Sequence, residues 1–122
     1  MVVAVDTSVF IDFLRRPQKQ SCLFLQLAKK YDIAVSFITI AELYSGKSSQ
    51  TAEGRKILET ILSGVAVHFP DKELLKEAGN LRCAYNLSLA DAFIAALALR
   101  LGISLSTLNT KDFVKIKELK LL

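Results

Sequence analysis

The chain has 122 residues, of which 52% are hydrophobic, and its 16 basic and 12 acidic residues leave a net charge of +4. This length suits one domain spanning residues 1–122, and the small positive charge is compatible with a polyanionic partner. The most apolar stretch, residues 87–105, contains Asp91, Arg100 and Gly102, which argues against a membrane span of roughly 18 apolar residues.

The first half of the chain alternates apolar runs typical of strands with longer patterns typical of helices. We predict a strand at residues 2–5, a helix to residue 14 that Asp6, Thr7 and Ser8 cap, and an amphipathic helix from Pro17 to Tyr31. These are followed by a strand at residues 33–36, a short helix at 38–44, a loop or helix entry at 47–53 and a helix at 55–62.

The second half of the chain repeats this alternation. A strand at residues 65–68 precedes a helix that Pro70 and Asp71 open and that runs to Tyr85, and then an apolar helix over residues 87–99. A fourth strand is predicted at residues 103–106, and residues 119–122 are a candidate fifth. Because strands and helices alternate without hairpin signals, the predicted fold is α/β, with three α/β/α layers around a parallel sheet of four to five strands.

Asp91 is a single carboxylate within the apolar helical run at residues 87–99. Helical spacing predicts that it points inward, on a face shared with Leu87, Ser88, Ile94, Ala95 and Ala98. A buried carboxylate loses its hydration at a cost of several kcal/mol unless a cation or hydrogen-bond donors compensate. This position therefore indicates chemistry rather than a solvated surface.

Other polar side chains follow the predicted strands at their carboxyl ends, where parallel α/β sheets bind ligands. Asp6 directly follows the first strand and Glu42 lies on the short helix after the second, while Asn109 follows the fourth with Asp112 close behind. In one cleft with Asp91, these acids would repel one another unless a cation lay between them. Oxygen ligands of this kind select Mg²⁺ or Mn²⁺ rather than Zn²⁺.

Each of these residues has a second interpretation when it is taken alone. Asp6 can be a helix cap, Glu42 a solvated helical residue, and Asn109 a turn residue. Asp112 can cap the last short helix. The set beside the strand ends is far more specific than any one of its members.

The cysteines and the histidine point away from other chemistry. Cys22 and Cys83 are far apart and belong to no metal-binding spacing, so we interpret both as small core residues in a reducing, cytoplasmic compartment. His68 is the only histidine, which argues against a pair of histidines acting as general acid and base.

Four segments resemble the PIN-domain family, specifically the VapC-type toxin ribonucleases of toxin–antitoxin systems. They are the stretch that begins with Asp6-Thr7-Ser8, residues 39–46 with Glu42, residues 89–96 with Asp91, and residues 107–113 with Asn109. The resemblance implies that Asp6, Glu42 and Asp91 bind the metal and act in catalysis. It places Asn109 where many relatives carry a fourth Asp, so Asn109 is a further ligand and catalytic candidate.

The resemblance also implies that the hydroxyls of Thr7, Ser8 and Thr107 support these ligands. Because the amide of Asn109 removes one negative charge from the cluster, Asp112 is an additional candidate ligand. Basic residues near the acidic segments are candidates for RNA contact and are equally compatible with ordinary solvated surface: Arg15, Arg16, Lys19, Lys47 and Lys111.

A protein of this type is an Mg²⁺-dependent endoribonuclease, with Mn²⁺ as a substitute, that hydrolyses RNA phosphodiester bonds with a metal-activated water. The resemblance further implies a homodimer inhibited by a cognate VapB-like antitoxin, and the apolar composition is consistent with both contacts. Two other functions are compatible with parts of the sequence. One is a PIN-fold protein that processes or binds RNA or DNA without an antitoxin. The other is a receiver-type signalling module, which needs an acceptor Asp where this chain has Phe69 and Pro70.

Overall fold

The apolar runs predicted as strands form one parallel sheet in the order β3-β2-β1-β4, in a computed structural model that describes residues 1–122. The strands are β1 (Val2–Val5), β2 (Asp32–Ser36), β3 (Ala66–His68) and β4 (Leu105–Ser106). The candidate fifth strand makes a single parallel bridge between Leu121 and Leu105. The predicted α/β class and parallel topology are confirmed.

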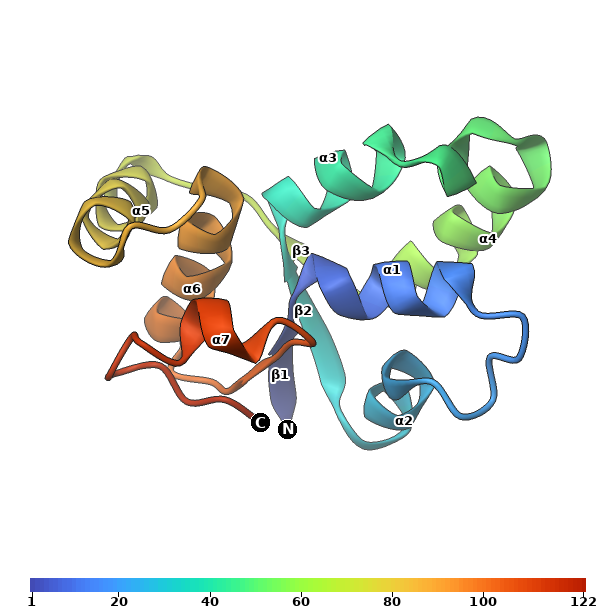
Figure 1. Cartoon of the computed structure of the whole chain (residues 1–122), viewed down its shortest axis with the longest axis horizontal. Helices are drawn as coiled ribbons and strands as arrows, with labels where there is room; N and C mark the ends of the chain where they lie inside the picture. Colours follow the sequence, from blue (N-terminus) through green and yellow to red (C-terminus); the bar gives the residue numbers. More distant parts are fainter.

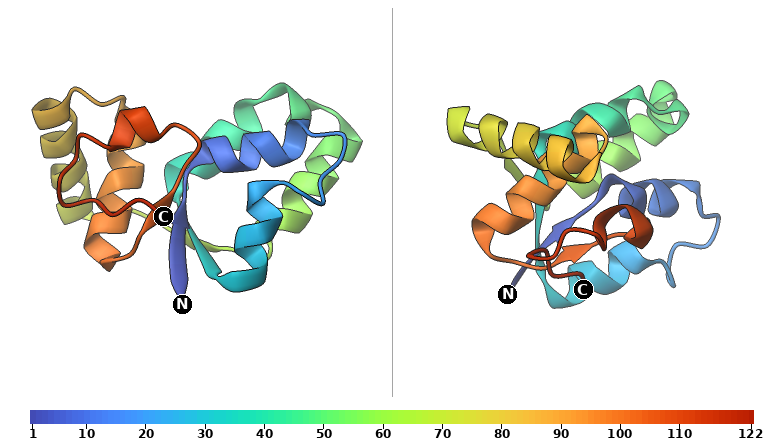
Figure 2. Two further views of the ribbon diagram at one scale, coloured as in Figure 1. Left: turned by 60° about the horizontal axis from the view of Figure 1, so that its bottom comes forward. Right: turned by 60° about the vertical axis from the view of Figure 1, so that its left-hand side comes forward.

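Helices cover both faces of the sheet (Figure 1). One face is covered by α1 (Thr7–Arg15), α2 (Leu23–Lys30) and α4 (Ala52–Leu62), and the other by α5 (Lys72–Tyr85), α6 (Leu89–Leu101) and α7 (Thr110–Phe113). Helix α3 (Phe37–Ser45) leaves the carboxyl end of β2 and contacts both α1 and α6, and a 3₁₀ turn, η1 (Lys47–Gln50), connects it to α4. Two further views show the same layers (Figure 2).

Alternate residues of β1 separate the two halves of the core. Val3 and Val5 pack with α1, α2 and α4, whereas Ala4 packs with α5 and α6. Since successive side chains of a strand point to opposite faces, a fully apolar run such as Val2–Val5 is what a sheet covered on both faces requires. The centre of α6 is buried on every side, from Ala92 to Ala98.

Helix α2 begins at Leu23 rather than at the predicted Pro17. Residues 17–22 instead turn back over the end of α1, where the Lys19 ammonium donates to the carbonyls of Phe13 at 2.7 Å and Arg16 at 2.9 Å. A lysine in this position satisfies carbonyls that have no partner within α1, which the pattern of apolar residues does not report. Cys22 is buried as predicted, but the core position predicted for Cys83 is wrong, because Cys83 lies on the outer face of α5.

The turn between α5 and α6 sets the position of Asp91. Asn86 ends α5 in the left-handed conformation with φ 54°, and the Ser88 hydroxyl then caps α6 by accepting from the backbone N–H of Asp91 at 3.1 Å.

No single helix is long and apolar enough to cross a membrane; only α5 and α6 taken together reach that length, and they are bent by 117°.

Candidate functional site

Asp6 is held by hydroxyl groups at the carboxyl end of the central strand. The side chain is 2% exposed, and its Oδ2 accepts from Ser8 Oγ at 2.7 Å and from Thr107 Oγ1 at 2.6 Å. Although Asp6 stands at the N-cap position of α1, its side chain accepts no backbone N–H there, so the predicted capping role is wrong. Because both donors meet Oδ2, Oδ1 is left without a hydrogen-bond partner.

Glu42 projects from α3 toward the start of α1. Its Oε1 accepts from Thr7 Oγ1 at 2.7 Å, and Thr7 Oγ1 also lies 3.0 Å from the hydroxyl of Thr39. Because Asp6 and Thr7 are adjacent, the same turn that fixes the first carboxylate also orients the second. Oε2 of Glu42 has no hydrogen-bond partner, so each of these two carboxylates keeps one oxygen free.

Asp91 lies in the first turn of α6 and is half-buried rather than inside the core. Burial raises the pKa of its carboxyl above the ordinary value of 3.8, and the negative charge of Asp6 raises it further; the Ser88 hydroxyl opposes both effects. The charges of Asp112 and Glu42 also raise this pKa, so acids from three other segments of the chain act on Asp91 at this edge of the sheet.

None of these acids forms an ion pair. The ion pairs of the protein lie elsewhere, in Arg16–Asp12, Lys76–Glu73, Arg100–Asp71 and Arg100–Glu77. No three acids lie close enough together to surround a metal ion in the arrangement seen here. Yet oxygen donors, uncompensated negative charge and two free carboxylate oxygens are the chemistry that a hard divalent cation requires, so the residues present fit Mg²⁺ or Mn²⁺.

Asn109 and Asp112 follow the end of β4 in different environments. The Asn109 side chain is exposed and makes no hydrogen bond, although its backbone N–H donates to Thr107 Oγ1 at 2.9 Å. Asp112 is half-buried, and its charge acts on Asp91. Both residues stay candidate ligands, with the electrostatic contact favouring Asp112.

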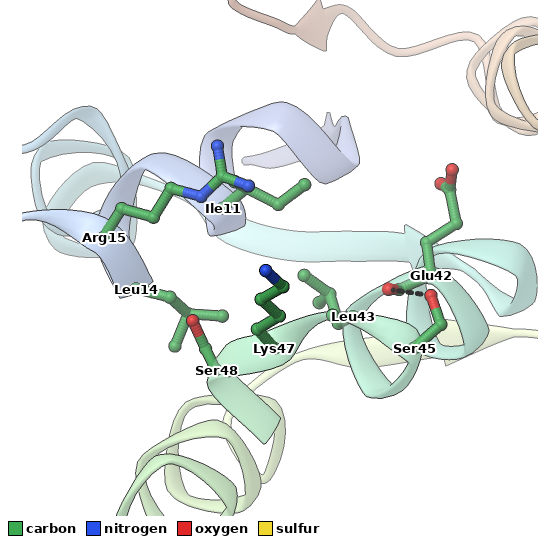
Figure 3. Close-up of a pocket in the computed structure, with 9 residues that line it drawn as sticks. Ile11, Leu14, Arg15, Glu42, Leu43, Ser45, Lys47 and Ser48 are labelled. Atoms are coloured by element: carbon green, nitrogen blue, oxygen red, sulfur yellow. Dashed lines mark hydrogen bonds between the residues drawn. The ribbon is translucent and has the colours of Figure 1, made fainter. Parts of the chain in front are cut away.

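The five basic residues named as candidates for RNA contact have different surroundings. Arg16 pairs with Asp12 at 2.9 Å, and Lys19 binds the carbonyls at the end of α1. Arg15, Lys47 and Lys111 are exposed and have no hydrogen bond or ion pair. Arg15 and Lys47 line the same hollow as Glu42 (Figure 3).

Thr39 is a functional candidate that the sequence reasoning missed. It is fully buried, three residues before Glu42, and its hydroxyl lies 3.0 Å from that of Thr7. Thr7 has one hydroxyl proton and a carboxylate only accepts, so Thr39 is left to donate to Thr7 while Thr7 donates to Glu42. The sequence signal that could have indicated this role is the position of Thr39, about one helical turn before Glu42.

Replacing Thr39 by Val should lower metal-dependent activity about 10- to 100-fold, because partners that orient a ligand typically contribute that much. Thr39→Ser keeps the hydroxyl and should retain activity. The metal concentration that gives half-maximal activity is the discriminating measurement: it should rise for Val and not for Ser. An unchanged metal requirement in Thr39→Val would show that this hydroxyl does not position Glu42.

The chain matches the PIN domain family over residues 3–119. No curated protein sequence matches it. Its fold is similar to a toxin–antitoxin complex from Klebsiella pneumoniae, with 28% identity, TM-score 0.77 and coverage of 96% of this chain and 94% of that one. It is also similar to DNA-bound VapBC from Salmonella typhimurium, with 19% identity, TM-score 0.82 and coverage of 100% and 97%.

VapBC2 from Rickettsia felis, bound to a promoter DNA fragment, is a third similar structure, with 24% identity, TM-score 0.80 and coverage of 100% of this chain and 98% of that one. The family match spans all four segments on which the predicted resemblance rested, and the similar folds are those of VapBC and other toxin–antitoxin complexes. The predicted resemblance is therefore confirmed, and the chain belongs to the PIN-domain family.

Proposed function

We propose that this protein is a Mg²⁺-dependent endoribonuclease, with Mn²⁺ as a substitute, that acts in the cytoplasm as the VapC-type toxin of a toxin–antitoxin pair. PIN domains are nucleases, so membership of the family supports a hydrolase acting on nucleic acid. The observation that carries the proposal is the set Asp6, Glu42 and Asp91, which come from three separate segments to one edge of the sheet without a cationic partner.

In this proposal, Asp6, Glu42 and Asp91 hold the metal, with Asn109 or Asp112 completing the site. A bound Mg²⁺ supplies a lowered pKa for a water molecule and neutralises charge on the phosphoryl oxygens. The protein supplies the orientation: Ser8 and Thr107 hold one oxygen of Asp6, and Thr7 holds one oxygen of Glu42. One of these three acids accepts the proton of the attacking water in this proposal.

Two surfaces support the proposed partners. A hollow of about 670 Å³ between α2 and α4 is lined by Phe24, Ala28 and Ile61, and suits an apolar segment of a VapB-like antitoxin. An entirely apolar hollow, which includes Phe37, Ile40 and Phe69, suits a second copy of the chain, since Phe69 is 77% exposed. Sedimentation of the purified protein at the mass of a monomer would contradict the homodimer.

The test of this function is cleavage of a cellular RNA pool by purified protein, with Mg²⁺ or with EDTA. We expect cleavage that requires the metal and leaves 5′-phosphate and 3′-hydroxyl ends. Glu42→Gln, purified in parallel, should lose more than about 100-fold of this activity, since it changes a direct ligand rather than a supporting partner. Cleavage that survives both EDTA and Glu42→Gln would contradict the proposal.

A further inference from the structure

We call the edge of the sheet that carries Asp6, Glu42 and Asp91 the acidic edge. A hollow of about 440 Å³ opens beside it, between the end of α1 and the turn that joins α3 to η1. Apolar side chains, among them Ile11, Leu14 and the buried Leu43, form part of its wall. Two cations enter it from opposite sides: Arg15 from the last turn of α1, and Lys47 from η1 (Figure 3).

Arg15 and Lys47 have no polar partner, whereas the basic residues that follow Arg15 in the sequence do. Arg16, next to Arg15, is bound by Asp12, and Lys19 donates to three carbonyls of residues 13–16. Neither Arg15 nor Lys47 makes a hydrogen bond or an ion pair. Two like charges directed into one hollow repel each other unless an anion lies between them. The unsatisfied charge of this hollow is therefore positive, in contrast to the adjacent acidic edge.

The turn that carries Lys47 is held firmly in place. The buried Ser49 hydroxyl donates to the carbonyls of Tyr44 at 2.7 Å and Gly46 at 2.9 Å, and Arg55 Nε donates to the Ser49 carbonyl at 3.2 Å. Gly54 of α4 lies so close to this turn that an added Cβ would be 1.7 Å from the Ser48 carbonyl oxygen. Lys47 thus projects from a fixed backbone, which limits the ordering required when an anion binds.

The hollow is continuous with the proposed catalytic edge through Glu42. Glu42 is the only acid in its lining, and the same carboxylate accepts from Thr7, the residue after Asp6. An RNA strand that has one phosphate bound at the acids must place its neighbouring phosphates along the adjacent protein surface. The cations that line the hollow on this side of Glu42 are Arg15 and Lys47.

We propose that Arg15 and Lys47 together bind a backbone phosphate of the RNA strand, adjacent to the phosphodiester that is cut. The Ser48 hydroxyl, which also lines the hollow and has no partner, is placed to donate to the same phosphate. This inference rests on the proposed function and deepens it, because it selects two of the five basic candidates and assigns them one subsite. An acidic segment of a protein partner is the competing occupant, which the test below separates.

The test uses Arg15→Gln/Lys47→Gln, with Lys29→Gln/Lys30→Gln as a control that removes the same charge from exposed positions at the end of α2. Cleavage of a labelled oligoribonucleotide is measured over a range of salt concentrations. The Arg15/Lys47 double variant should show a KM about 10-fold higher or more, with kcat little changed. Its salt dependence of log(kcat/KM) should be shallower by about 0.7, since each phosphate neutralised on a single strand contributes about 0.7 and the two cations share one phosphate. The control should resemble the wild type.

Neutral methylphosphonate linkages, placed one at a time beside the cut site, then locate the phosphate. At one position, the neutral linkage should lower the kcat/KM of the wild type by the same factor as the Arg15/Lys47 substitutions do. The same linkage should not lower the kcat/KM of the double variant any further. A double variant with wild-type KM and salt dependence would overturn the subsite while leaving the nuclease intact. Normal cleavage combined with loss of inhibition by an acidic peptide would overturn it in favour of a protein partner. Wild-type protein that cuts no RNA would overturn the proposed function together with this inference.

Discussion

Asp91→Asn should abolish metal-dependent cleavage, with a loss of more than about 100-fold, while making the metal-free protein more stable. The loss follows because a neutral amide replaces one of the three charged ligands that we propose; supporting partners alone typically contribute 10- to about 100-fold. The gain follows because the Asp91 charge is half-buried and is repelled by Asp6, Asp112 and Glu42. The backbone N–H of residue 91 keeps its Ser88 cap in this variant, so α6 should begin at the same place.

The stability difference should depend on pH in a defined direction. A raised pKa means that folded Asp91 holds its proton more tightly than the unfolded chain does. Protonation of Asp91 thus stabilises the fold at low pH. This contribution is lost as the pH rises from the ordinary value of 3.8 through the raised pKa. In EDTA, wild-type stability should fall relative to Asp91→Asn across this window, as thermal unfolding would measure.

Metal should reverse the order of stability at neutral pH. A cation that binds only the folded wild type at 100 times its Kd stabilises it by about 2.7 kcal/mol, and Asp91→Asn should show little of this effect. Asp32→Asn serves as the matched control, since it removes an exposed acid that begins β2, at the opposite end of the sheet, and that forms no ion pair; it should respond to metal as the wild type does. Asp91→Asn that is no more stable than wild type in EDTA would contradict the repulsion that we infer.

Thr107→Val should reduce both activity and stability, because one buried hydroxyl serves two partners. Thr107 Oγ1 donates to Asp6 Oδ2 at 2.6 Å and accepts from the backbone N–H of Asn109 at 2.9 Å. Valine has a similar shape but leaves the Asn109 N–H without this acceptor, and it leaves Asp6 Oδ2 with Ser8 as its only hydrogen-bond donor. We expect about 1–3 kcal/mol lower stability in urea unfolding, and activity lower by about 10- to 100-fold.

Thr107→Ser keeps the hydroxyl and is the control for this prediction. It should stay close to wild type in cleavage and lose only the packing of one methyl group, about 1 kcal/mol. Equal activity in Thr107→Val and Thr107→Ser would mean that Ser8 alone orients Asp6.

The parts of the fold that depend on local pattern could be predicted from the sequence. Val2–Val5 is apolar at every position because both of its faces are covered, and this indicated a parallel strand. Asp71 was predicted to open the helix that follows β3, and it caps α5 by accepting from the N–H of Leu74 at 2.8 Å. The chain order of strands and acids indicated one shared edge because parallel strands end together.

The parts that depend on contacts between distant segments could not. Spacing within the run at residues 87–99 predicted an inward Asp91, but Asn86 and Ser88 start the helix later and leave Asp91 in its first turn. A buried Asp6 can cap its own helix or bind side chains from elsewhere, and only the approach of Thr107 decides between them. Lys19 was a candidate for RNA contact because it is a basic residue close in sequence to Asp6. Its contacts with the carbonyls of α1 depend on how residues 17–22 turn, and the sequence pattern does not indicate that turn.

The measurement that tests the central claim most directly is binding of Mn²⁺ to the purified protein, followed by electron paramagnetic resonance and by titration calorimetry. If Asp6, Glu42 and Asp91 jointly hold a divalent cation, wild-type protein should bind Mn²⁺, Mg²⁺ should compete for the same site, and binding should weaken as the pH falls through the raised pKa of Asp91. Asp91→Asn and Glu42→Gln should each lose this binding while remaining folded. Mn²⁺ binding of equal strength in all three proteins would contradict the account, because the ion would then be held by other residues.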